Sequence, residues 1–208
     1  MITYSSQYAQ ICLAIFAVFA TRADATSIVK MTFEELCGRA DVVFVGTVVG
    51  SEGRRDDQSG MIHTYTTFRD VAVAAGEDGV TIGDGFVLRT LGGVVGDESL
   101  IVHGMPRFDV GRRYVVFLKA GGQRVCPVVG WGQGCFHVID SGEPGGGSPT
   151  VRAYREAGVG REQFSGGYST SAGTDGQSTV RLDEFVDEIR ETFAREHAAG
   201  IESPPTTP

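Results

Sequence analysis

The chain has 208 residues, of which 41% are hydrophobic, and 26 Asp and Glu outnumber 18 Lys and Arg to give a formal net charge of -8. This length suffices for one domain with a full hydrophobic core. The acidic balance argues against sequence-independent binding to nucleic acid, which needs Lys and Arg to neutralise phosphates, and against adhesion to anionic lipid.

The first 25 residues have the pattern of an export signal. An unbroken apolar run covers residues 11–20, and the triplet Ala-Asp-Ala at 23–25 is of the small-x-small kind that signal peptidases cut after. The run is shorter than the roughly 20 apolar residues that span a bilayer. We therefore interpret residues 1–25 as a signal peptide, with a buried N-terminal strand or helix as the alternative because residues 1–10 contain no Lys or Arg.

Cleavage after residue 25 would leave a mature chain that starts at Thr26 and works in the periplasm or outside the cell. Removing the first 25 of the 208 residues leaves 183. No later segment is apolar for long enough to be a membrane span, so we expect none in the mature chain.

Residues 26–140 are predicted to form one mainly β domain. A short helix opens it at Thr32–Cys37, where Thr32 and Glu35 have the spacing of a capping box. The charged stretch 51–60 is expected to be a mobile loop, and Gly92, Gly93 and Gly96 suggest a bulge or a close backbone approach. About seven apolar, β-branched strands are expected, at residues 42–49, 63–73, 86–91, 99–102, 113–118, 125–129 and 135–139.

No long helix alternates with these strands, which argues against a parallel sheet. Their spacing favours a single small antiparallel barrel that is OB-like. Residues 141–180 are rich in Gly, Ser and Thr and are interpreted as an extended connection, and residues 201–208 as a disordered tail. Residues 181–200 are predicted to be an amphipathic helix packed on the barrel through a stripe of Leu182, Phe185, Val186, Ile189 and Phe193.

Three cysteines remain after the proposed cleavage, and outside the cytosol a disulfide is the default expectation. Cys126 and Cys135 are equally distant from Gly130-Trp131, which has the composition of a hairpin turn. If the hairpin forms, the two lie opposite each other, and we predict a Cys126–Cys135 disulfide with Cys37 left over. The alternative is that all three are small buried hydrophobic residues.

No catalytic, cofactor or metal motif is present, so we assign no catalytic residue, no cofactor and no metal ligand. The four histidines lack the spacing of a metal site or of a catalytic helix, and no phosphate-binding loop or nucleophile elbow occurs. Trp131 is the only Trp, and it lies between two glycines at the predicted turn. It is expected either to anchor a binding partner or to fold back over the end of the barrel.

Three stretches together resemble a family of exported bacterial β-barrel proteins that has no established activity. They are Ala40–Gly46, Gly92-Gly93 with the Gly-x-Pro-x-Phe-x-x-Gly segment Gly104–Gly111 and its strand to Leu118, and Val129–Phe136. The resemblance implies an exported β-barrel, and it directs attention to Arg107 and Gln133, which with Trp131 are our candidate binding residues.

More distantly, the pattern is similar to the OB-type barrel of netrin and metalloproteinase-inhibitor modules. That inhibitor family reaches a catalytic metal with an N-terminal cysteine. Here the predicted mature N-terminus is Thr26 and the nearest cysteine is Cys37, which argues against protease inhibition.

The sequence thus favours an exported, non-catalytic β domain that binds an extracytoplasmic partner or supports the envelope. One alternative is an enzyme with an unfamiliar site around His137 or His103. Another is an inhibitor-like module that presents the Trp131 loop to its partner.

Overall fold

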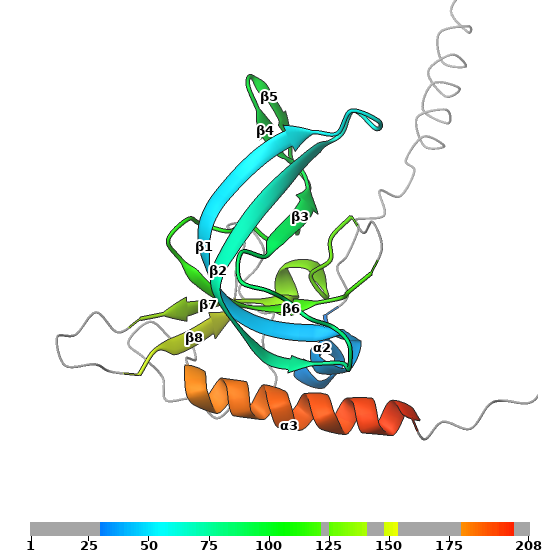
Figure 1. The fold of residues 1–208 in the computed structure, drawn as a ribbon, viewed down its shortest axis with the longest axis vertical. Coiled ribbons are helices and arrows are strands. Elements are labelled where there is room, and N and C mark those ends of the chain that lie inside the picture. Colours follow the sequence, from blue (N-terminus) through cyan, green and yellow to red (C-terminus); the bar gives the residue numbers. More distant parts are fainter. Residues whose placement is uncertain (1–29, 122–124, 141–147, 154–179, 202–208) are drawn as a thin grey trace, which may run out of the picture.

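The computed structural model describes residues 30–121, 125–140, 148–153 and 180–201 (Figure 1). The predicted signal peptide, most of the predicted connection at 141–180 and the predicted tail beyond residue 201 lie outside the described residues.

The described chain is mainly β, as predicted. Seven strands form one antiparallel sheet in the order β3-β2-β1-β6-β7-β8-β9, and a separate hairpin pairs β4 with β5. The strands are β1 (Val42–Arg55), β2 (Ile62–Gly76), β3 (Val87–Leu91), β4 (Gly93–Val95), β5 (Glu98–Leu100), β6 (Arg113–Leu118), β7 (Cys135–Ile139), β8 (Thr150–Ala153) and β9 (Val180–Arg181).

Strands β1 and β2 are long and bent, and they carry the curvature of the sheet (Figure 1). Their register shifts at three places between Val43 and Gly50, and such bulges bend and twist a strand pair. The predicted mobile loop at 51–60 is wrong in its first half, because residues 51–55 continue β1. Glu52 and Arg54 lie on this paired strand and form an exposed ion pair at 2.8 Å. Charged side chains are therefore compatible with a strand here, and charge alone did not indicate a loop.

Side chains alternate along β1 between two hydrophobic cores. Val43 and Val45 belong to a core on the helix side of the sheet, whereas Val42, Phe44 and Val48 belong to a core inside the curl of the sheet. Successive residues of a strand point to opposite faces, so a strand that is buried on both sides must be apolar at consecutive positions.

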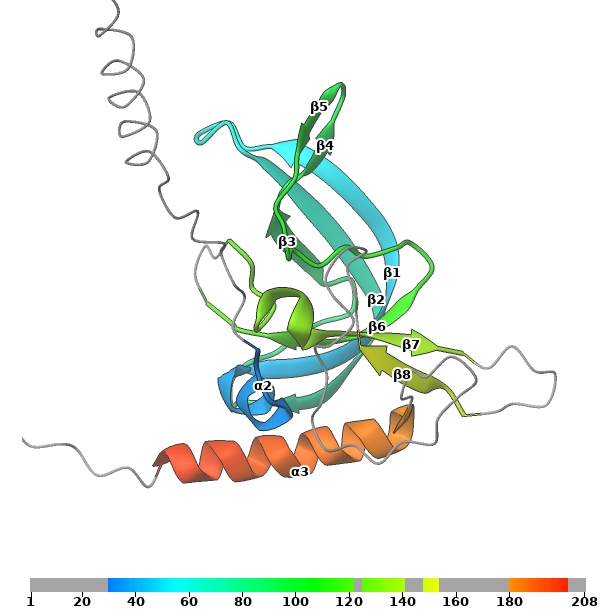
Figure 2. The ribbon, with the colours of Figure 1, turned by 180° about the vertical axis from the view of Figure 1, so that it is seen from behind.

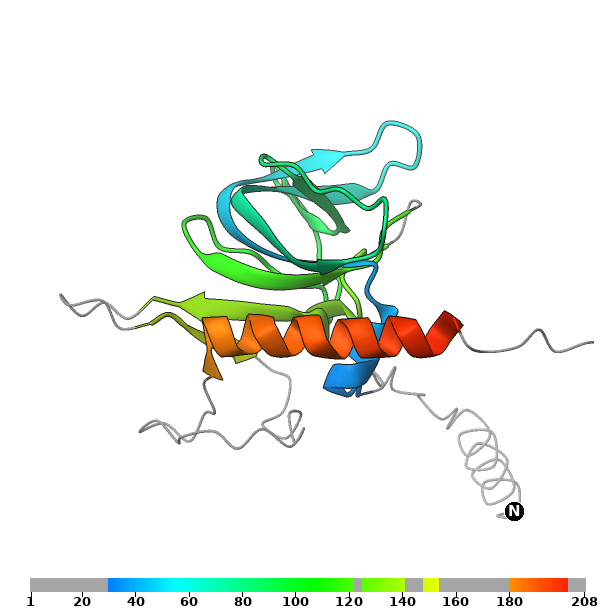
Figure 3. The ribbon, with the colours of Figure 1, turned by 60° about the horizontal axis from the view of Figure 1, so that its bottom comes forward.

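Two helices cover the helix-side core. Helix α2 (Phe33–Arg39) starts with the predicted capping box of Thr32 and Glu35. Helix α3 (Leu182–Ile201) runs along the same side of the sheet (Figure 3). The predicted apolar stripe of α3 packs into this core, and the Arg190 guanidinium donates to the Ala74 carbonyl of β2 at 3.2 Å.

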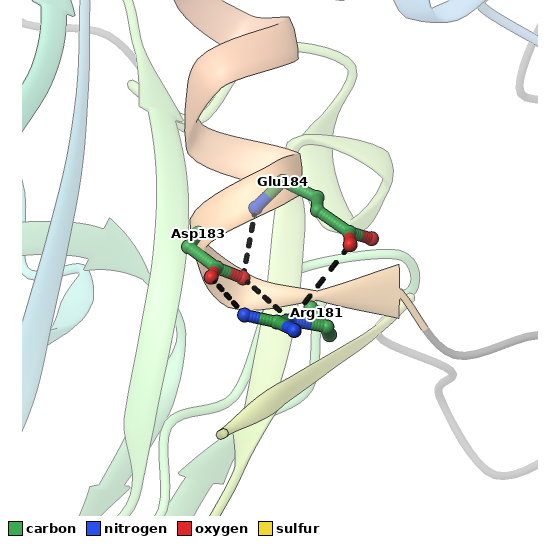
Figure 4. A network of polar contacts seen from close by, with 3 residues as sticks. All are labelled: Arg181, Asp183 and Glu184. Carbon is green, nitrogen blue, oxygen red and sulfur yellow. Dashed lines mark hydrogen bonds and ion pairs between the residues drawn. The ribbon is translucent and has the colours of Figure 1, made fainter.

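The junction of β9 and α3 carries an exposed polar network. Figure 4 shows Arg181 against the carboxylates of Asp183 and Glu184. Acidic side chains in the first helical turn interact favourably with the helix dipole. Because all three side chains are exposed, the network contributes little to the stability of the fold.

The predicted OB-like barrel is not closed by strand pairing in the described part of the chain. The predicted strand 125–129 contributes a single bridge, from Val128 to Leu118 of β6, and its other neighbour is β3, where the Leu91 amide donates to the Val125 carbonyl at 3.1 Å. Pro127 has no amide hydrogen with which to extend either ladder. Strand spacing therefore predicted seven of the extended segments, but it missed β4, β8 and β9, of which β8 lies in the predicted connection, and it did not give the pairing.

The predicted hairpin around Gly130-Trp131 is also wrong. Val128 lies opposite Leu118 and Cys135 lies opposite Val116, so the two segments follow the same edge of β6 in the same direction. Between them the chain makes a short 3-10 helix, η1 (Trp131–Gly134). A Cβ on Gly134 would lie 2.4 Å from the Val129 carbonyl oxygen, so this compact insertion requires glycine there.

Asp41 fastens the start of β1 to the end of β6. Its carboxylate accepts a hydrogen bond from the Ala120 amide at 2.6 Å and lies 3.1 Å from the Lys119 ammonium. Its own amide donates to the Leu118 carbonyl, and its carbonyl accepts from the Glu77 amide.

We predict that Asp41→Ala lowers the free energy of unfolding by about 2 kcal/mol, because a largely buried, charge-assisted hydrogen bond is lost. Urea denaturation measures the change. Asp84→Ala is the matched control, since Asp84 pairs with Arg69 at 3.5 Å on the exposed surface and should contribute less than about 1 kcal/mol. Equal effects of the two variants would contradict the role assigned to Asp41.

Candidate functional site

A cavity of about 540 Å³ lies at the end of the curved strands that is remote from α3. Its floor comes from β2 and β3, and its other walls come from the β4–β5 hairpin and from residues 101–109. Figure 2 shows the hairpin rising beside the far ends of β1 and β2. This volume is within the range of about 300–1,000 Å³ that is typical of small-molecule sites.

Two glycines let the hairpin approach the sheet. A Cβ on Gly53 of β1 would lie 2.0 Å from the Val94 carbonyl oxygen. Gly93 has a φ of +132°, and a Cβ there would lie 2.3 Å from the Thr64 hydroxyl oxygen. The predicted close approach is confirmed at Gly92, where a Cβ would lie 2.9 Å from the Leu100 carbonyl oxygen, and at Gly93, but it is wrong at Gly96, which has no atom within 4 Å of that position.

Threonines form the polar floor of the cavity. Thr66 and Thr90 are only 1% and 3% exposed, and both line the cavity. The Thr64 hydroxyl donates to the Gly92 carbonyl at 2.7 Å. Hydroxyls that line a cavity can donate hydrogen bonds to a ligand and accept them from it.

The opposite wall is apolar and rigid, with charges at its rim. The Phe108 ring packs edge-on against Tyr114 and Phe68, at centroid distances of 5.1 and 5.3 Å, and the Asp109 amide donates to the Tyr114 hydroxyl at 2.9 Å. These contacts fix the position of the wall relative to β2 and β6. The exposed side chains of Arg107 and Asp109 also line the cavity.

The structure separates the three candidate binding residues. Arg107 lines the cavity, whereas Trp131 and Gln133 lie in η1. The Gln133 side chain accepts from the Met31 amide at 2.9 Å and donates to the Gly130 carbonyl at 3.3 Å, so it fastens the N-terminal segment. Trp131 is half-buried with a φ of +59°, a left-handed conformation that is rare for a bulky residue.

The three described cysteines are free thiols, in contrast to the predicted Cys126–Cys135 disulfide. The hairpin that would place them directly opposite each other is absent, although Cys126 packs against the core that contains Cys135 and the two side chains interact electrostatically. Burial raises the pKa of Cys37 to about 12 and that of Cys126 to about 11, and it also raises the pKa of the fully buried Cys135. All three thiols therefore stay protonated at neutral pH and are poor nucleophiles.

The two histidines proposed for an enzymatic site differ in their surroundings. His103 is exposed, whereas His137 is half-buried with its ring 4.6 Å from that of Tyr114. Desolvation lowers the pKa of His137, with Asp109 opposing the shift and Arg112 and Arg152 adding to it. Within the described ranges, no group of three or more His, Cys, Asp and Glu side chains could hold a metal ion.

Among the described residues, no helix is both long and apolar enough to cross a membrane. The chain matches no protein-family model, no curated protein and no solved structure. The interpretation of the cavity therefore rests on its geometry alone.

Sequence reasoning missed the threonine floor. The available signal was the placement of Thr64 and Thr66 two residues apart on a strand that continues to the core residue Phe68. Residues at this spacing share one face of a strand, so the polar face of β2 runs directly into the core.

We predict unequal effects for two isosteric substitutions in this floor. Thr66→Val should change the free energy of unfolding by less than about 0.5 kcal/mol, because the Thr66 hydroxyl is not a buried unsatisfied group and does not hold Gly92. Thr64→Val should lower it by about 1 kcal/mol, because it removes the hydrogen bond to Gly92. Thermal and urea denaturation measure both changes, and equal destabilisation by the two variants would contradict the role assigned to the Thr64 hydroxyl.

Proposed function

We propose that this protein is an exported, non-catalytic binding protein whose ligand occupies the cavity between β2, β3 and the β4–β5 hairpin. The observation that carries the proposal is the pair of threonines, Thr66 and Thr90, that are 1% and 3% exposed and line the cavity opposite an apolar wall. Small-molecule sites are typically concave, mostly apolar and lined by a few converging polar groups, which is the composition of this lining.

The lining defines the chemistry of the ligand. Hydroxyls on the floor both donate and accept hydrogen bonds, while Met105 and Phe108 offer apolar contact on the facing wall. Arg107 and Asp109 supply one positive and one negative group at the rim. A compact, polar molecule with one apolar side fits this combination. Residues 105–109 would distinguish it from molecules that lack the apolar side.

We further propose that the curled sheet is an incompletely closed OB-type barrel. The support is topological. β3 and β6 run in opposite directions because each follows from β1 by antiparallel pairings, and residues 125–129 run opposite to β6. Residues 125–129 therefore lie parallel to β3 and between β3 and β6, joined to β3 by the Leu91–Val125 hydrogen bond. OB barrels are Greek-key barrels of five strands that are partly open.

Binding can be tested by nuclear magnetic resonance with a library of small amides, polyols and carboxylates. We predict that fragments which bind perturb the amides of residues 88–93 and 105–109, and that a Thr66→Val, Thr90→Val double variant weakens them at least about tenfold, since each buried hydroxyl partner contributes about 1 kcal/mol. Asp84→Val is the control for a surface substitution. Fragments that bind only at other residues would contradict the assignment of the cavity.

The export part of the proposal is supported by the apolar run and the Ala-x-Ala triplet, and it can be tested by intact mass. We predict that the secreted or periplasmic protein has a mass beginning at Thr26. Alkylation in denaturant without reduction should add three groups, for Cys37, Cys126 and Cys135. Four added groups on a full-length chain would contradict export, and a single added group would contradict the free thiols of the structure.

A further inference from the structure

A second polar site lies beside the core, away from the cavity floor. Tyr114 of β6 pairs with His137 of β7, and His137 pairs with Arg152 of β8. Residues that pair directly across an antiparallel sheet point to the same face, so these three side chains form one row on the inner face of the sheet. The row passes from the fully buried Tyr114 to the half-buried His137 and Arg152.

The segment before β6 folds over this row. The Asp109 amide donates to the Tyr114 hydroxyl, and the Arg112 amide donates to the Asp109 carbonyl at 3.1 Å. The Arg112 carbonyl in turn accepts from the Val48 amide at 2.9 Å, which fixes the turn against β1. This turn brings the side chains of Asp109 and Arg112 close enough to His137 to act on it electrostatically.

Positive charge is in excess around His137. Two guanidinium groups, from Arg112 and Arg152, and one carboxylate, from Asp109, act on its ring. The neighbouring Arg113 points to the other face of β6 and lies 3.8 Å from the Asp140 carboxylate. Arg112 and Asp109 are exposed, so water screens their charges, whereas Arg152 is half-buried and is the partly desolvated charge of this group.

Arg152 carries a further sign that a partner is missing. Its Nε is buried and has no hydrogen-bond partner in the described structure. The Nε and one terminal nitrogen of a guanidinium form a fork that matches two oxygens of a phosphate, sulfate or carboxylate group. A bound oxyanion would satisfy the buried nitrogen and offset the excess of cations at once.

We propose that Arg152, Arg112 and His137 form an oxyanion-binding site that accepts a doubly charged tetrahedral group such as a phosphate monoester. Arg152 binds two of its oxygens, Arg112 closes over it from the turn, and His137 donates a further hydrogen bond when protonated. Tyr114 sets the position of the imidazole ring through the contact between the two rings. The site is independent of the proposed cavity ligand, because none of these four residues lines the cavity.

Binding should be linked to the protonation of His137. Desolvation, Arg112 and Arg152 hold its pKa below the ordinary value, so the ring is neutral at pH 7 in the absence of anion. An anion favours the imidazolium, so it should raise the pKa of His137 and should itself bind more tightly as the pH falls through that pKa. The Asp109 carboxylate favours the same protonated form of the ring.

The test is a pH titration of the His137 ring signals by nuclear magnetic resonance, on the whole chain, with sodium sulfate against sodium chloride at equal ionic strength. Sulfate is the probe because it stays doubly charged between pH 5 and 8. We expect sulfate to raise the pKa of His137, and Arg152→Gln and Arg112→Gln each to weaken sulfate binding by about tenfold, the typical effect of one charge-assisted hydrogen bond.

Three variants distinguish this site from a general effect of positive charge on the protein surface. Arg113→Gln removes the same charge from the other face and should leave sulfate binding within about twofold, as should the cavity variant Thr66→Val. Arg152→Lys keeps the positive charge but loses the forked guanidinium, so it should bind sulfate with intermediate affinity. It replaces Arg152→Gln in the comparison if that variant fails to fold. An unchanged His137 titration in sulfate, or equal losses in Arg113→Gln and Arg152→Gln, would overturn the proposal.

Glycerol 3-phosphate and vesicles that contain phosphatidic acid then distinguish the source of the oxyanion. A rise in the pKa of His137 with glycerol 3-phosphate alone supports a small soluble ligand. A rise with both probes supports a site that also accepts a lipid headgroup. A site that binds sulfate but neither phosphate monoester would overturn the assignment of the ligand class.

Discussion

The structure depends on β1 being buried on both of its faces. Val43 and Val45 fill the helix-side core, and Val42, Phe44 and Val48 fill the inner core, so the two cores share one backbone. The strand therefore cannot shift in register by one residue without exchanging the side chains of both cores at once. Asp41 fixes that register at the start of the strand, and the bulges that follow bend the sheet toward the hairpin. The position of the cavity follows from that bend.

The elements could be predicted from the sequence where local chemistry decides them. Thr32 and Glu35 specify the start of α2, the stripe from Leu182 to Phe193 specifies the buried face of α3, and the runs around Val43 and Val115 specify strands. Pairing was harder to predict, because it depends on residues that are distant in sequence. The segment 125–129 is extended as expected, yet Pro127 limits its hydrogen bonding, and the glycines around Trp131 form a compact insertion instead of a hairpin turn. The predicted disulfide was lost with the hairpin on which it depended.

The candidate sites were less predictable than the fold. Arg107 was identified and does line the cavity, but Thr66 and Thr90 are recognisable only once β2 and β3 are seen to pair beneath the β4–β5 hairpin. His137 was singled out for a different reason, and only the register of β6, β7 and β8 places it between Tyr114 and Arg152. At the second site the buried Arg152 Nε lacks a partner within the described protein, which is a property of the assembled structure and not of sequence spacing. Such a group reduces stability, and a protein that keeps it gains a place where a ligand can bind.

The pairing of β1 with β6 has a consequence for the time course of folding. Each residue of β1 that pairs with β6 has its partner more than 60 residues later in the chain. The helix-side core also needs α3, which is synthesised later still. Contacts between such distant segments carry a high loop-closure entropy, so they form slowly. A chain emerging from the ribosome can form the β1–β2 hairpin early, but it cannot complete either core until β6 has been synthesised. The topology thus delays completion of the native fold until almost the whole chain is available.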